Sequence, residues 1–348
     1  MNKITNWVKE HQVTTFFILA FAITWPLFWL IYFVFPGNSL VLVLAGGPLA
    51  VFSPALAAML ISAISEPHPK QQNGKSRWIA FGVSWFISWL IMTLYYWQVV
   101  KLDLQLAAIL WAVFALLPAW VLSSAYARTP GIRKHFSSLI RPKGNLIWYF
   151  VALFSVPALQ ILGIAVTRLL GGEIQFYLDM SSGVIFLSLT FFSGFLCSGG
   201  INEESGWRGF ALPRLQAHYP VILAAGIVWF FWALWHIPYD IGLGTPLEQI
   251  LFNRIVNNLV FSVLFAWVYN RTKGSILAPA LFHPSMNTFG DHFPVTPITL
   301  GLFAALAIFA IIYDKMWKKL PSDNPAVYPE PTNEVIGVLK NIRKGGGR

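Results

Sequence analysis

Charged side chains are scarce in this chain of 348 residues, since Asp, Glu, Lys and Arg together make up only 11% of it. A soluble globular protein carries about 25% charged and about 45–50% apolar residues, whereas the apolar share here is 56%. This composition excludes intrinsic disorder, which requires the opposite balance. It also leaves too little polar surface for a soluble enzyme of this length. We therefore predict a polytopic membrane protein with an all-α, helical-bundle fold.

Cysteine and acidic residues are also few. The single cysteine, Cys197, excludes an internal disulfide and any metal site built from several cysteines. The 14 acidic residues are outnumbered by 24 basic ones, which gives a formal charge of +10. No basic stretch alternates with aromatic residues as a nucleic-acid site would require. We therefore expect no nucleic-acid partner and assign the basic surplus to loops that face the cytoplasm.

Long apolar runs give the expected membrane segments, because a helix needs about 20 predominantly apolar residues to cross a bilayer. The runs starting at residues 221 and 275 are short and could form buried or re-entrant helices instead of full spans. The count is therefore about 8–10 segments. The runs are 13–34, 40–64, 78–100, 104–127, 145–170, 183–201, 221–236, 247–270, 275–289 and 297–317.

Basic residues gather in alternate loops, after the second, fourth, sixth, eighth and tenth runs. The positive-inside rule then places both termini in the cytoplasm. We expect residues 1–319 to form one transmembrane domain. Residues 320–348, which are rich in Pro, Asn and Lys, are expected to form a mobile cytoplasmic tail.

Ionisable residues at membrane depth are costly and are functional candidates by default. The first cluster contains Glu203, Glu204 and Arg208. On a helix Glu204 and Arg208 share a face and can pair, whereas Glu203 lies about 100° around the axis and points elsewhere. Alternatively, the cluster is a surface salt bridge at the end of a span.

Two further clusters contain histidine. Trp232 precedes His236 by one turn and could orient its imidazole, although an aromatic belt residue beside an interfacial histidine explains the pair equally well. His283 and Asn287 are also one turn apart, and their donors could stabilise an oxyanion or serve as interhelical contacts. Because Pro284 disfavours helical geometry at the residue before it, His283 is expected to open a helix.

Together, the three clusters supply what peptide hydrolysis needs. Glu203 can deprotonate a water molecule, His236 can share that water, and the third cluster can hold the oxyanion. However, Glu203 lies at one end of the sixth run and His236 at the far end of the next. We therefore expect a broken or short helix there, lining a water-filled cavity.

The three motifs, in this order, resemble the CAAX protease and bacteriocin-processing family (CPBP, or Abi) of intramembrane endopeptidases, which includes the CAAX prenyl protease. The likeness covers residues 184–289, the protease-like core. Trp232 stands where Phe is commoner, and Pro284 replaces the small residue that usually follows the last histidine. The family motif Glu-Glu-x-x-x-Arg corresponds here to Glu203-Glu204 with Arg208. The second motif, an aromatic residue before a histidine, corresponds to Trp232 with His236. The third, His-x-x-x-Asn, corresponds to His283 with Asn287.

The resemblance implies a multi-pass hydrolase of the cell membrane, which we expect to be bacterial, acting on a membrane-tethered peptide or protein, for which a prenylated substrate is one option. It implies that Glu203 is the general base, that His236 shares the water, and that His283 and Asn287 form the oxyanion site. Glu204, Arg208 and Trp232 would support them. We favour a glutamate-type mechanism without a cofactor. A zinc metalloprotease would use Glu203, His236 and His283 as ligands, but the zinc signature His-Glu-x-x-His is absent.

Two other functions fit the same residues. The chain could be a non-catalytic bacteriocin-immunity or scaffold protein that keeps the motifs as structural contacts. It could also be a proton-coupled transporter with Glu203 and His236 as a relay, although no internal repeat supports that interpretation.

Overall fold

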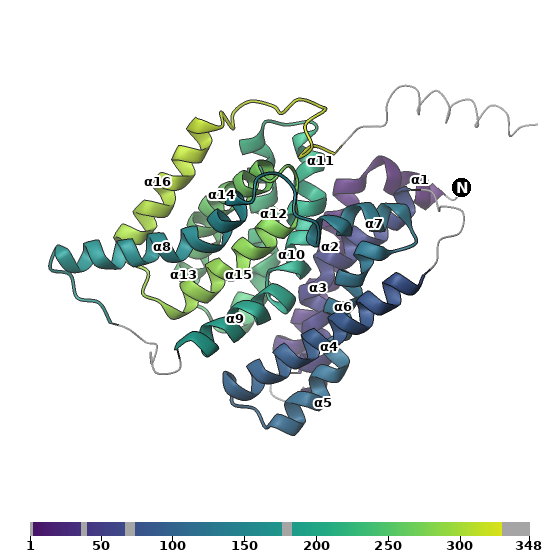
Figure 1. The fold of residues 1–348 in the computed structure, drawn as a ribbon, viewed down its shortest axis with the longest axis horizontal. Coiled ribbons are helices and arrows are strands. Elements are labelled where there is room, and N and C mark those ends of the chain that lie inside the picture. The colour runs from purple at the N-terminus through teal and green to yellow at the C-terminus, as the bar shows by residue number, and fades with distance from the viewer. Residues whose placement is uncertain (1–2, 36–39, 67–73, 176–182, 329–348) are drawn as a thin grey trace, which may run out of the picture.

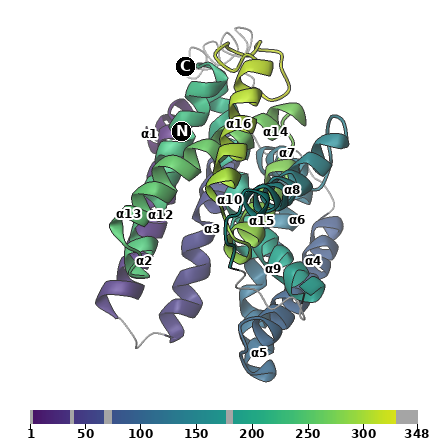
Figure 2. The same cartoon turned by 90° about the vertical axis from the view of Figure 1, so that its left-hand side faces the viewer.

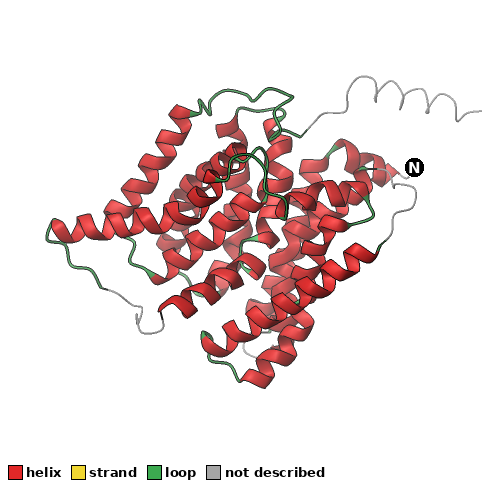
Figure 3. Ribbon diagram, viewed as in Figure 1, coloured by secondary structure: helices red, strands yellow, loops and turns green. Residues whose placement is uncertain are grey.

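The computed structural model describes residues 3–35, 40–66, 74–175 and 183–328, and all regular elements in these ranges are helices (Figure 3). The prediction of an all-α bundle is confirmed. The first part of the chain forms α1 (Lys3–Glu10), α2 (Gln12–Trp29), η1 (Leu30–Val34), α3 (Leu40–Ser65), α4 (Lys75–Gln98), α5 (Leu104–Phe114), α6 (Leu116–Ser123), η2 (Ser124–Tyr126), α7 (Pro130–Phe136) and η3 (Ser137–Leu139).

The remainder of the described chain contains the three sequence clusters. Its elements are α8 (Ile147–Leu169), α9 (Gly183–Cys197), α10 (Ile201–Gly206), η5 (Trp207–Ala211), α11 (Leu212–Gln216), α12 (Val221–Gly242), α13 (Leu247–Leu251), η6 (Phe252–Asn257), α14 (Asn258–Arg271), α15 (Leu277–His292) and α16 (Pro297–Tyr313).

Eight helical stretches within the described ranges are long and apolar enough to cross a membrane. The first five agree closely with the apolar runs of the sequence. The helices α15 and α16 are shorter and are not among the eight. A multi-pass membrane protein is thus supported, while the orientation of the termini and the bacterial source stay predictions.

The sixth and seventh spans are longer than predicted. The sixth runs through Gly183–Gln216 and the seventh through Val221–Gly242, whereas the apolar runs stop at residues 201 and 236. The polar cluster ended the sixth run prematurely, because hydropathy treats Glu203 and Glu204 as loop residues. In the fold they lie near the middle of the helical stretch, inside protein rather than in water.

The segment α10–η5–α11 lies in the middle of the bundle. Figures 1 and 2 both place α10 there, and it contacts α3, α9 and α15. Every residue from 201 to 216 is buried. Polar side chains on this segment must therefore find partners within the protein, because burying them unpaired is costly.

The first residues of the expected tail are held against the bundle. The backbone N–H of Tyr328 donates to the Pro213 carbonyl at 3.0 Å. The Gln216 side chain donates to the Ala326 carbonyl at 2.9 Å. These contacts hold the start of the tail beside the end of α11. Residues 329–348 lie outside the described ranges, so the mobile tail and its boundary stay predictions.

Candidate active site

Glu203 and Trp232 come from different spans and meet in the bundle. The indole Nε1 of Trp232 donates to Oε2 of Glu203 at 2.7 Å, and both side chains are buried. The other carboxylate oxygen, Oε1, has no hydrogen-bond partner among the described side chains. The hydrogen bond to Oε2 therefore orients the Glu203 carboxylate, and Oε1 can accept a hydrogen bond from another group.

Glu204 forms the centre of a separate buried network. Its Oε1 accepts from Nη1 of Arg208 at 2.8 Å and lies 2.7 Å from Nδ1 of His283. All three side chains are at most 3% exposed. The pairing of Glu204 with Arg208, expected from their spacing, is present, and the contact with His283 is an addition that no local spacing predicts.

The Arg208 guanidinium is also enclosed by aromatic rings. Its Cζ lies 4.4 Å from the centroid of the Trp232 ring and 4.0 Å from that of Phe265. Contacts of this kind stabilise a cation that has been removed from water. Trp232 therefore contacts both acidic groups. Its N–H donates to Glu203, and its ring face packs on Arg208, the ion-pair partner of Glu204.

His236 lies one turn beyond Trp232, as the spacing predicted. Its Nδ1 is 2.7 Å from the backbone carbonyl of Trp232. Because a carbonyl oxygen can only accept, Nδ1 must carry the proton, and in a neutral ring Nε2 is then left with a lone pair. The contact thus fixes the tautomer and leaves Nε2 to accept a hydrogen bond.

His283 lies inside α15, which begins six residues earlier at Leu277 and continues through Pro284 to His292. The expectation that His283 opens a helix is therefore wrong. Proline only disfavours the helical conformation of the preceding residue, and packing overrides this preference here, since both residues are buried between neighbouring helices.

A break between α9 and α10 makes room for the His283 ring. Gly199 in this break has φ of +108°, and a Cβ built on it would lie only 2.4 Å from Nε2 and Cδ2 of His283. The Gly199 N–H donates to the side chain of Asn202, which in turn donates to the Val51 carbonyl of α3. Only glycine fits both this backbone conformation and the close approach of the ring.

Asn287 approaches the same break. Its Nδ2 donates to the Ser198 carbonyl at 3.2 Å, and the side chain is only half-buried. His283 and Asn287 thus reach neighbouring residues of the break, Gly199 and Ser198. The expectation that these two side chains point to one region agrees with the geometry.

A cavity of about 670 Å³ joins the three clusters. Glu203, His236, His283 and Asn287 all line it, together with Trp232. The separation of Glu203 from His236 that straight spans would impose does not arise, because Glu203 lies in the middle of its span. The helix break expected near this point is present at residues 198–200.

The cavity is also lined by polar residues that were not among the candidates predicted from the sequence. Arg254 forms a two-pronged ion pair with Asp240, with nitrogen–oxygen distances of 2.6 and 2.7 Å. Asn253, Asn257 and Asn258 lie beside it on η6 and α14. Their signal was visible in the sequence, because polar residues inside an apolar run at membrane depth are functional candidates.

The described side chains do not fit the expected zinc set. No group of three His, Cys, Asp or Glu residues within the described ranges is arranged to hold a metal ion. We therefore derive no catalytic step through a metal.

Comparison with known proteins identifies the same part of the chain. The protein is 27% identical over 186 residues to a protein named CAAX prenyl protease 2 from Methanococcus maripaludis, an alignment that covers 49% of this chain and 67% of the relative. The family model for type II CAAX prenyl endopeptidases, Rce1-like, matches residues 181–289. This region contains all three motifs and the helix break, so the resemblance of the chain to the CAAX prenyl protease family is confirmed.

Proposed function

We propose that this protein is an intramembrane endopeptidase of the CAAX prenyl protease type, which hydrolyses a peptide bond of a membrane-tethered substrate. The observation that carries the proposal is the convergence of Glu203, His236, His283 and Asn287 on one cavity within the bundle. The family match and the named relative support a protease of this type.

Activation of water is assigned to Glu203 and His236. The free Oε1 of Glu203 accepts a proton from a water molecule in the cavity. Nε2 of His236 accepts a hydrogen bond from the same water, because the Trp232 carbonyl fixes the proton on Nδ1. The Trp232 indole holds the carboxylate of Glu203 in place through its other oxygen.

Stabilisation of the oxyanion is assigned to His283 and Asn287. Nδ1 of His283 faces the Glu204 carboxylate. An ionised carboxylate accepts hydrogen bonds and cannot donate them, so Nδ1 must carry a proton. Donation from Nε2 then requires a ring that carries both protons, and the Glu204 carboxylate is the counter-ion for that imidazolium. The Asn287 amide donates to Ser198 through Nδ2 and has a second N–H for the substrate.

The bond changes follow from these roles. The water oxygen adds to the peptide carbonyl carbon, and the proton that it loses goes to Glu203. The carbon–nitrogen bond then breaks, and Glu203 returns the proton to the amine that leaves. The products are a carboxylic acid on the tethered part of the substrate, which holds the second proton of the water until it ionises, and a released peptide with a free amino group.

The test is cleavage of a fluorogenic, prenylated CAAX peptide by detergent-purified protein. The wild type is compared with Glu203→Gln and Glu203→Ala, and with Glu173→Gln as a matched control, because Glu173 is exposed outside the cavity. We expect both Glu203 variants to lose activity by at least about a hundredfold, as removal of a general base does. The Glu173 variant should cleave at the wild-type rate.

The same assay run with a zinc chelator separates the two mechanisms. Cleavage that persists with chelator supports metal-free activation of water by Glu203, and cleavage that chelator abolishes and zinc restores supports a metalloprotease. Normal cleavage by folded Glu203→Ala would refute the assigned role. If the wild type cleaves no prenylated peptide, the non-catalytic immunity or scaffold function becomes the better explanation.

A further inference from the structure

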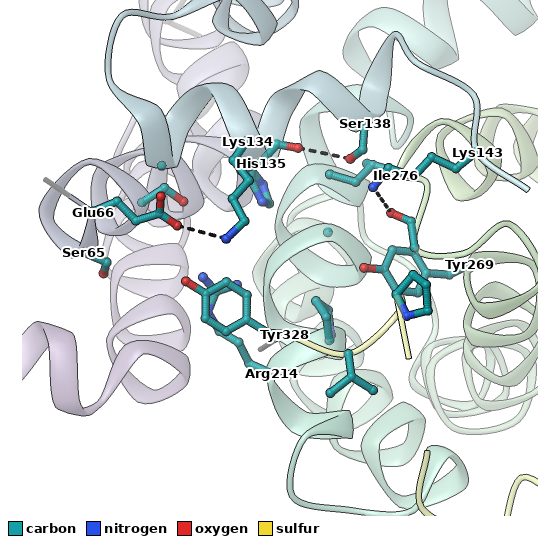
Figure 4. Close-up of a pocket in the computed structure, with 17 residues that line it drawn as sticks. Ser65, Glu66, Lys134, His135, Ser138, Lys143, Arg214, Tyr269, Ile276 and Tyr328 are labelled. Atoms are coloured by element: carbon teal, nitrogen blue, oxygen red, sulfur yellow. Dashed lines mark hydrogen bonds and ion pairs between the residues drawn. The ribbon is translucent and has the colours of Figure 1, made fainter. Parts of the chain in front are cut away.

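A second cavity, of about 130 Å³, lies where several spans end (Figure 4). It is lined by Ser65 at the end of one span, and by Arg214 and Tyr269 close to the ends of two others. Lys134 and Lys143 come from the connection between the fourth and fifth spans. The cavity therefore lies at one boundary of the membrane, apart from the residues of the candidate active site.

Basic side chains outnumber acidic ones around this cavity. Among the described residues, Lys134, Lys143 and Arg214 line it, against the single carboxylate of Glu66. That carboxylate lies 3.4 Å from Nζ of Lys134, in a pair that is largely exposed on the lysine side. Among the described residues, Nζ of Lys143 donates only to the Gly274 carbonyl, at 3.4 Å. The cavity thus carries positive charge that its own acid does not balance.

Arg214 is the most deeply buried of these cations, with 8% of its surface exposed. Its Nε donates to the Gln12 side chain and its Nη1 to the Phe210 carbonyl. Its guanidinium lies between the rings of Phe210 and Tyr328, at 3.5 and 3.7 Å from their centroids. Within the described part of the chain, no carboxylate forms an ion pair with it. Buried charges normally have such a partner.

Unpartnered polar atoms in the lining provide a second, independent sign of a missing ligand. The buried Oγ of Ser65 has no hydrogen-bond partner among the residues described, although buried polar groups usually have one. Tyr269, whose side chain is only 4% exposed, also lines the cavity. Figure 4 shows Tyr269 on the opposite side of the cavity from Glu66 and Lys134.

His135 also lines the cavity but is not one of its cations. Its Nε2 lies 2.9 Å from the Ser205 carbonyl and therefore donates to it. Burial, with the nearby charge of Arg214, lowers the pKa of His135 to about 3. The imidazole is thus neutral at physiological pH, and the attraction for an anion rests on the lysines and Arg214.

We propose that this cavity binds a phosphate-type anion, supplied either by the headgroup of an anionic phospholipid or by free inorganic phosphate. Its cations would balance the ligand's charge, and the Tyr269 hydroxyl would donate to a phosphate oxygen. Basic pockets between helices at the membrane surface bind phosphorylated lipid headgroups in this way. The small volume admits a phosphoryl group and leaves acyl chains in the bilayer.

The test measures binding and is independent of proteolysis. Full-length protein in detergent is titrated with inorganic phosphate while its thermal unfolding is followed. In parallel, native mass spectrometry scores adducts of phosphatidylinositol 4-phosphate against phosphatidylcholine. The variants are Tyr269→Phe and the double variant Lys134→Gln/Lys143→Gln. Lys318→Gln is the control, because it removes an exposed positive charge outside the cavity.

We expect the double variant to weaken phosphate binding by about tenfold or more, because it loses charge-assisted hydrogen bonds. Lys318→Gln should bind phosphate as the wild type does. Lipid adducts that phosphate displaces would identify a headgroup as the ligand, and stabilisation by phosphate without such adducts would identify the free anion. Tyr269→Phe removes one oxygen and keeps the ring, so it is expected to fold. No phosphate or lipid binding by the wild type, or equal binding by all variants, would overturn the proposal.

Discussion

The indole N–H of Trp232 donates to Oε2 of Glu203 at 2.7 Å, while the face of the same ring covers Arg208, the partner of Glu204. One side chain from α12 thereby orients the proposed base and encloses the ion pair beside it. The two adjacent acids consequently have different environments. Glu203 faces the cavity, and Glu204 is committed to Arg208 and His283.

Trp232→Phe should lower kcat by about tenfold or more, because it keeps an aromatic ring but leaves Glu203 without its donor. We expect KM to change little, since Trp232 acts on the carboxylate rather than on the substrate. The measurement is steady-state cleavage of the prenylated peptide. A kcat equal to that of the wild type would show that the indole N–H does not position Glu203.

Glu204→Gln should destabilise the protein by about 3–5 kcal/mol, because it leaves the Arg208 guanidinium buried without its charge partner. Glu66→Gln is the comparison, since the Glu66–Lys134 pair is largely exposed and such pairs contribute about 0–1 kcal/mol. Thermal unfolding in detergent measures both variants. Equal unfolding temperatures would contradict the structural importance of the Glu204 network.

Gly199→Ala should displace the His283 ring, because the added Cβ would lie 2.4 Å from it and φ of +108° is unfavourable for alanine. We expect loss of cleavage together with a lower unfolding temperature. Gly226→Ala on α12 is the matched control, because nothing lies within 4 Å of its Cβ position. Alanine there should be neutral or slightly stabilising.

Acid should destabilise the fold through His135. Burial lowers its pKa from 6.5 to about 3, so below pH 6.5 the unfolded chain takes up a proton that the folded protein does not. Stability therefore falls as the pH drops from about 6.5 toward 3, by at most about 1.4 kcal/mol per pH unit from this group. The unfolding temperature of His135→Gln should depend less on pH than that of the wild type over this range. Parallel curves for the two proteins would contradict this linkage.

Asp240→Asn should loosen Arg254 where it lines the larger cavity, since it removes the charge of a two-pronged ion pair. If Arg254 contacts substrate, KM should rise severalfold while kcat changes less. Cleavage assayed over a range of peptide concentrations separates the two parameters. Unchanged values of both would show that the pair serves only to hold α12 against η6.

Much of this protein was accessible from sequence because the relevant patterns are local. Apolar runs predicted the first five spans closely, and one-turn spacing predicted the pairing of Glu204 with Arg208 and the approach of Trp232 to His236. These interactions join residues on a single helix, where 3.6 residues per turn fix which side chains are neighbours.

How the three clusters combine depends on the packing of the helices. Hydropathy ended the sixth span at residue 201, because it treats buried acids as exposed ones. Packing continues the helix to Gln216 and brings Glu203 level with Trp232. The contact of His283 with Glu204 and the fit of its ring over Gly199 join segments about 80 residues apart, which no local period specifies. The chemically reactive side chains could be recognised from local patterns, whereas the packing of α10 among α3, α9 and α15 brings particular ones together.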